Sequence, residues 1–238
     1  MHDQGKRRHF PYAHPTFGSK ARPKSEGAWK KSVYYWWWAY LKRSERYLRT
    51  CKDPSSGELK ELHEHFGDVR SEDFRSWWNR ESRGAQLFAE PKADEVVRIV
   101  TSADDVVFDA GALLVSLPLN LPKRHLQRKV RDLLMKHHKG RRGHSVARSS
   151  RALFKVRGQP NAPALETGLM VYDFWKANPE MPLWKIGNEL RLLPKDRVRD
   201  GDSHHEKVSK KNVLAATVSR YLRRVKASIA ATEQGQFP

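Results

Sequence analysis

The chain has 238 residues, of which 38% are hydrophobic and 31% charged, so it can bury a core and is not wholly disordered. Lys and Arg total 46 against 27 Asp and Glu, and the net charge of +19 indicates a polyanionic partner such as nucleic acid. No apolar run approaches the roughly 20 residues of a membrane span, and the basic N-terminus lacks the apolar stretch of a secretory signal. The lone Cys51 excludes an internal disulfide and a cysteine-based zinc site. We therefore expect a cytoplasmic protein with no membrane partner, no metal and no cofactor.

The positive charge is concentrated in two zones of the chain. Residues 1–50 carry a net charge of +9 and residues 111–160 carry +12, whereas residues 51–110 between them carry −6. A uniformly solvated surface would not show this alternation. The distribution predicts a binding face that is assembled from separate parts of the chain.

Composition also predicts how the chain is divided. Residues 1–27 are poor in aliphatic side chains and interrupted by Pro and Gly, which is typical of a flexible basic arm. Residues 28–138 are expected to form a domain of helices with a small sheet. A basic linker over residues 139–160 and a C-terminal helical domain over residues 161–238 follow.

Apolar residues at three- and four-residue spacing predict three helices in the first half of the chain. The first begins at Ala28 and ends before Asp53, and the second covers Ser56–Phe66. Ser71 is expected to cap the third, which stops by Gly84.

Three β-branched or apolar runs then predict strands, at residues 95–101, 106–108 and 112–119. We expect them to form a small, mostly antiparallel sheet packed on the helices. Pro118 places the third strand at an edge or ends it there, because proline donates no hydrogen bond to a ladder.

A basic helix follows from Pro122 to His138, with leucines on its inner side. Its cations and those of the linker suit contact with phosphates, which fixes position and affinity but not sequence. The alternative is a disordered linker with incidental charge. The residues expected to bind nucleic acid here are Lys123, Arg124, Arg128, Lys129, Arg131, Arg141, Arg142, Arg148 and Arg151.

The C-terminal domain has the outline of a helix-turn-helix unit, in which a short helix from Leu183 to Leu190 precedes a long one capped by Ser209. The long helix carries residues that can read base edges: Lys210, Lys211, Asn212, Arg220, Arg223, Arg224 and Lys226. However, residues 191–207 separate the two helices, where such a unit takes three or four residues. An ordinary three-helix bundle, a solvated basic face and a protein-docking surface remain alternatives.

The run Tyr34–Trp38 consists of five consecutive aromatic residues. Such a run surrounds a helix, so we expect some rings to face away from the core. Those rings could stack on unpaired bases or bind a partner protein. Aromatic residues at helical spacing more commonly belong to a core.

Catalytic and metal sites have little support in the sequence. The histidines lie in no frame that matches a known metal site. Five acidic residues could form a two-metal nuclease site, although turns and helix ends also explain them: Glu64, Asp68, Asp104, Asp105 and Asp109.

Four segments together resemble uncharacterised bacterial proteins that are associated with plasmids, phages and integrative elements. They are the aromatic run that begins at Tyr34, His65-Phe-Gly-Asp, Phe74-Arg-Ser-Trp-Trp and Leu87-Phe-Ala-Glu-Pro. The resemblance covers residues 30–91 and extends into the C-terminal third. It implies a mobile-element or host-defence setting and brings no assigned activity.

We therefore predict an α+β protein, predominantly helical, with a small antiparallel sheet and a C-terminal bundle of helix-turn-helix type. The predicted function is non-enzymatic DNA binding, as a regulator or an accessory factor of a mobile element or defence system. An RNA-binding component of a ribonucleoprotein complex and a metal-dependent nuclease are the alternatives.

Overall fold

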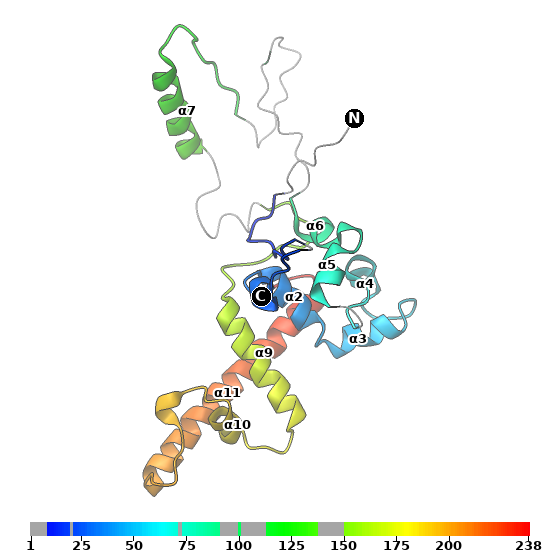
Figure 1. The fold of residues 1–238 in the computed structure, drawn as a ribbon, viewed down its shortest axis with the longest axis vertical. Helices are drawn as coiled ribbons and strands as arrows, with labels where there is room; N and C mark the ends of the chain where they lie inside the picture. Colours follow the sequence, from blue (N-terminus) through cyan, green and yellow to red (C-terminus); the bar gives the residue numbers. More distant parts are fainter. Residues whose placement is uncertain (1–8, 20, 71–72, 91–99, 101–112, 138–149) are drawn as a thin grey trace.

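The computed structural model describes residues 9–19, 21–70, 73–90, 100, 113–137 and 150–238. Every regular element in these residues is helical (Figure 1). The elements are α1 (Glu26–Trp29), α2 (Val33–Leu41), α3 (Glu45–Lys52), α4 (Lys60–Phe66), α5 (Phe74–Asn79), the 3-10 turn η1 (Arg80–Ser82), α6 (Arg83–Phe88), α7 (Lys123–His137), α9 (Ala162–Ala177), α10 (Leu183–Glu189), the 3-10 turn η3 (Pro194–Asp196) and α11 (His204–Glu233).

The predicted α+β class is wrong, because the described residues contain no strand and no sheet. The first two expected strands lie outside those residues, apart from Val100, which has no regular structure. The third expected strand is irregular over residues 113–118, and its apolar side chains, such as Leu114 at 61%, are exposed. A strand needs a hydrogen-bonded neighbour and one buried face, and this segment has neither among the described residues.

The helix expected from Ala28 onward is three helices, because the backbone turns at two serines. Ser32 and Ser44 have extended backbone angles and precede α2 and α3. The Ser44 side chain accepts a hydrogen bond from the Tyr47 amide at 2.9 Å and so caps α3. The third expected helix is α5, which ends at Asn79 and so stops before Gly84 as predicted, while Gly84 itself lies inside the next helix, α6, against the Trp78 ring.

Helix α2 forms the centre of the core. All nine of its residues are buried, so the expectation that some rings of Tyr34–Trp38 face away is wrong. The reason is that other elements cover α2 on every side. Trp37, for example, contacts the rings of Phe66, Phe88, Phe154 and Phe237 at centroid distances of 5.2 to 6.1 Å.

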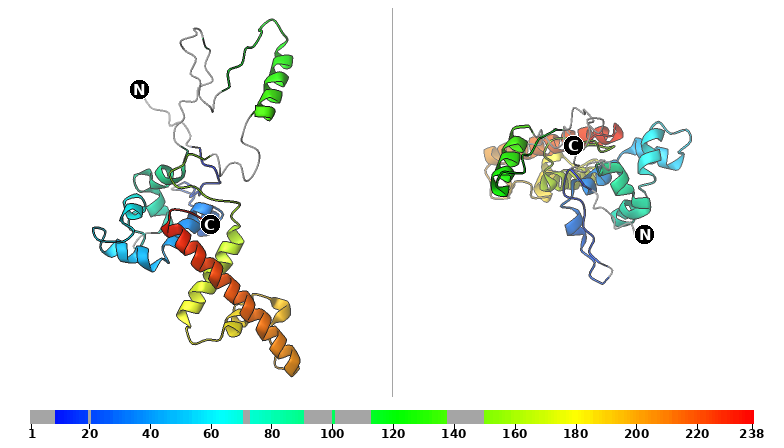
Figure 2. Two further views of the ribbon diagram at one scale, coloured as in Figure 1. Left: turned by 180° about the vertical axis from the view of Figure 1, so that it is seen from behind. Right: turned by 90° about the horizontal axis from the view of Figure 1, so that it is seen from above.

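The C-terminal helices share this core with α2 (Figure 2). α9 and α11 both contact α2. The Tyr40 hydroxyl donates to the Leu165 carbonyl at 3.1 Å, and Gly168 lets α9 approach both Tyr40 and Val225 closely. Phe237, after α11, is fully buried with its ring centroid 5.3 Å from that of Tyr40.

Part of the expected N-terminal arm packs on the core as a strap, which we define as residues 9–17. The rings of Phe10, Tyr12 and Phe17 are half-buried against core residues, and Pro15 is buried. The Tyr12 amide donates to the Tyr34 hydroxyl, and the Tyr12 hydroxyl donates to the Gly158 carbonyl at 2.6 Å. The strap therefore joins α2 to the segment that leads into α9.

Helix α7 differs from the other long helices because none of its residues is buried. Within the described part of the chain, neither α7 nor any other helix has the length and apolar character that crossing a membrane requires.

Candidate nucleic-acid interface

Helix α11 begins six residues before the expected position. Its cap is Ser203, whose side chain accepts from the Glu206 amide while the Glu206 carboxylate accepts from the Ser203 amide. Ser209 lies inside the helix. Residues 190–203 therefore connect α10 to α11, which is far longer than the three- or four-residue turn of a helix-turn-helix.

This long connection is held against the two helices. The Asn188 side chain accepts from the Val198 amide at 2.9 Å, and the Lys207 ammonium donates to the Asp200 carbonyl at 2.8 Å. Gly187 of α10 lies close to Leu214 and Val218 of α11, so the two helices pack tightly. The C-terminal part is thus an ordered bundle, and its geometry does not match a short-turn DNA-reading unit.

Three of the basic residues expected to bind nucleic acid on α11 are engaged within the protein. Lys210 forms an ion pair with Asp202 at 2.7 Å. Lys211 and Lys226 each lie 4.4 Å from the ring centroids of Trp184 and Trp175, respectively, in cation–π contacts. These three cations help to attach α11 to α10, α9 and the connection.

The other four expected residues form what we call the arginine face of α11: Asn212, Arg220, Arg223 and Arg224, all exposed. Arg223 and Arg224 lie one turn after Arg220, and small exposed residues such as Ala216 and Ser219 separate them from Asn212. None of the three arginines forms an ion pair with a carboxylate of the described residues. Their guanidinium groups are therefore available to an external anion.

Three carboxylates of the C-terminal part are paired with other cations. Asp173 of α9 pairs with Arg43, and Glu233 at the end of α11 pairs with Arg46 at 2.8 Å. A hydrogen bond from Lys210 lowers the pKa of Asp202, so that carboxylate stays ionised and paired. The positive charge of the arginine face is consequently left without compensation from these groups.

Helix α7 is a second basic surface. Arg124, Arg128 and Arg131 recur at helical spacing and are exposed, as are Lys123 and Lys129. The opposite side carries half-buried apolar residues, while Leu134 and Met135 are exposed at 49% and 65%. The sequence prediction that leucines of this helix point inward is therefore only partly met.

Of the four remaining residues that were predicted to bind nucleic acid, the structure describes one. Arg141, Arg142 and Arg148 lie outside the described residues. Arg151 is exposed, and its backbone amide donates to the Glu90 carboxylate at 2.8 Å. The structure thus shows the two basic surfaces on α7 and α11, while residues 138–149 of the segment after α7 lie outside the described chain.

The acidic residues considered for a nuclease do not form a cluster in the described chain. Asp68 is paired with Arg70 at 2.7 Å, and that hydrogen bond lowers its pKa. Asp104, Asp105 and Asp109 lie outside the described residues. Among the residues that are described, no group of three or more His, Cys, Asp or Glu is arranged to hold a metal ion.

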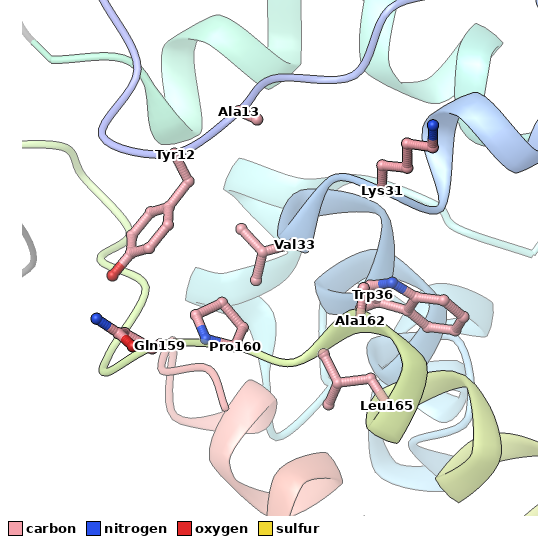
Figure 3. A pocket seen from close by; sticks show the side chains of 9 residues that line it. All are labelled: Tyr12, Ala13, Lys31, Val33, Trp36, Gln159, Pro160, Ala162 and Leu165. Carbon is pink, nitrogen blue, oxygen red and sulfur yellow. The ribbon is translucent and has the colours of Figure 1, made fainter. Parts of the chain in front are cut away.

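A pocket of about 270 Å³ lies where three distant segments meet, and sequence reasoning missed it (Figure 3). It is lined by Tyr12, Ala13, Lys31, Val33, Trp36, Gln159, Pro160, Ala162 and Leu165. No periodicity or motif links these positions, so only the packed fold could bring them together.

Comparison of the chain with known protein families, with curated proteins and with solved structures gives no match. No residue role can therefore be transferred from another protein, and the interface rests on the chemistry of its own side chains.

Proposed function

We propose that this protein binds duplex DNA without enzymatic activity and grips the phosphate backbone with the arginine face of α11. The observation that carries the proposal is that Arg220, Arg223 and Arg224 are exposed and share no ion pair with a described carboxylate. The basic side of α7 supplies a second set of phosphate contacts. A regulator or accessory factor that acts on DNA in the cytoplasm fits this description.

Guanidinium groups favour phosphates for a physical reason. A planar guanidinium offers parallel N–H donors that match two phosphate oxygens. Each phosphate neutralised also releases condensed counterions, which drives binding at low salt. The small residues of the arginine face, Ala216 and Ser219, leave the helix surface accessible to a closely approaching backbone.

The long connection over residues 190–203 favours a grip on the backbone over the reading of bases. A recognition helix is positioned in the major groove by a short-turn neighbour, and α10 is not such a neighbour. We therefore expect the arginine face to contribute affinity that depends little on sequence, because phosphates carry no base information.

The test compares two triple variants of equal net charge. The first changes Arg220, Arg223 and Arg224 to Ala. The second removes three exposed cations from the α10 side of the bundle, by changing Lys185, Lys195 and Arg197 to Ala. Fluorescence anisotropy with a labelled 20-base-pair duplex then measures affinity over a series of salt concentrations.

The slope of the logarithm of the binding constant against the logarithm of the salt concentration should be less negative by about 3 in the arginine-face variant, if each arginine neutralises one phosphate. The loss should be equal on two unrelated duplex sequences, and the control variant should bind nearly as the unmodified protein does. If both variants lose affinity equally, net charge and not the arginine face carries binding. A salt slope shallower than about −2 for the unmodified protein contradicts the proposal altogether.

A further inference from the structure

The pocket of Figure 3 lies at the N-terminal end of α9, where the strap crosses α2. Tyr12 and Ala13 come from the strap, Lys31, Val33 and Trp36 from α2 and the residues before it, and the rest from residues 159–165. Drug-sized ligands occupy pockets of about 300–1,000 Å³. At about 270 Å³, this pocket suits a smaller ligand.

The two aromatic residues of the pocket have their polar atoms bonded within the protein. The Tyr12 hydroxyl donates to the Gly158 carbonyl at 2.6 Å, and the Trp36 indole N–H donates to the Lys30 carbonyl at 2.7 Å. Burial raises the pKa of Tyr12, so its hydroxyl stays protonated and keeps this bond. The rings are therefore held in place, and with Val33 and Leu165 they offer a ligand mainly apolar surface.

Two polar side chains lie on opposite sides of the lining (Figure 3). Lys31 is exposed and carries a positive charge, and Gln159 offers both a donor and an acceptor. The pocket thus combines a mainly apolar lining with one cationic side chain, Lys31, and one amide, Gln159.

We propose that this pocket takes one unpaired base of the DNA, with the adjoining phosphate held by Lys31. The inference rests on the proposed function. It adds that the preferred DNA has an end or a gap at which one base is unpaired. A planar base suits apolar and aromatic walls, its edge can hydrogen-bond an amide such as Gln159, and its phosphate needs a cation.

The first experiment isolates the base from its phosphate. Three duplexes are titrated with the full-length protein: a blunt duplex, the same duplex with a one-nucleotide overhang, and that duplex with an abasic overhang. We expect the overhang that carries a base to bind at least about fivefold more tightly than the abasic one, which is the low end for stacking of one base.

Two variants place this preference in the pocket. Ala13→Leu puts a larger side chain at an exposed lining position and should remove the preference while leaving the melting temperature and the blunt-duplex affinity unchanged. Lys31→Ala should weaken binding of both overhang duplexes, because both keep the phosphate. Lys185→Ala, which removes an exposed cation on α10, is the matched control and should change neither.

The outcomes separate the two proposals. Equal affinity for base-carrying and abasic overhangs, with normal binding of the blunt duplex, overturns the pocket proposal and leaves the proposed function standing. A preference for the base that survives Ala13→Leu also overturns it.

If no duplex binds, the proposed function fails, and a second experiment tests the pocket proposal by itself. The protein is titrated with the four nucleoside monophosphates, and binding is followed by NMR of the Trp indole signals. A shift of the Trp36 signal that Ala13→Leu abolishes supports it, and no shift with any of the four refutes it.

Discussion

Replacing Phe237 with alanine tests whether α11 and the first helices share one core. The Phe237 side chain is fully buried, and its ring centroid lies 5.7 Å from that of Trp37 and 5.3 Å from that of Tyr40. Its carbonyl also accepts from the Arg157 amide at 2.7 Å, which the substitution leaves intact. A buried Phe→Ala change costs about 3–5 kcal/mol through lost transfer free energy and the cavity left behind.

A loss of that size is a large part of the 5–15 kcal/mol that typically separates folded from unfolded protein. For a chain of this length, each kcal/mol lowers the melting temperature by about 2–4 °C, so we expect a fall of about 6–20 °C. Differential scanning calorimetry of Phe237→Ala measures this fall, with Leu119→Ala as the control. Leu119 is 86% exposed, so its truncation should cost under about 0.5 kcal/mol. Equal melting temperatures for the two variants would refute the shared core.

Further predictions concern local features of the fold. Deleting residues 1–17 should destabilise the protein by about 2 kcal/mol or more beyond any effect of deleting residues 1–8 alone, because the strap rings are lost from the core; thermal unfolding of both truncations checks this. Ser203→Ala should destabilise the protein by about 1 kcal/mol through loss of the cap, while Ser209→Ala should be neutral, as urea unfolding would show. Gly84→Ala should cost about 1–3 kcal/mol in the same assay, since the new Cβ would overlap the neighbouring indole ring.

The helices of the C-terminal part could be predicted from sequence because their apolar spacing is regular. Leu214, Val218 and Leu222 recur at four-residue intervals, and all are buried as expected. The start of α11 was misplaced although a signal was present. Ser203 is followed three residues later by Glu206, the pattern of a capping box, whereas Asn212 stands at that distance from Ser209.

Other features depend on contacts that no local pattern contains. The aromatic run of α2 is buried on all sides because α9, α11, α5, α6 and the strap surround it, and a helix seen alone cannot show that. Composition predicts a strand at residues 112–119, but composition does not reveal whether a neighbouring strand exists. The pocket joins residues 12–13 to residues 159–165 and could not have been found without the fold.

Some of the predicted basic residues of α11 make contacts within the protein and others are exposed without an ion pair. The position of the helix explains both. Along its buried side, α11 contacts α10, α9 and α2 in turn, so cations near this seam meet tryptophans and carboxylates of the neighbouring elements. Lys211 and Lys226 lie over indole rings there, and Lys210 pairs with Asp202. Arginines on the opposite side meet no such groups among the described residues. The sequence supplies the cations, but the orientation of α11 decides which of them stabilise the bundle and which can bind a phosphate. Phe237, which follows α11 and packs against Trp37 and Tyr40, helps to hold α11 in the orientation that leaves the arginine face exposed.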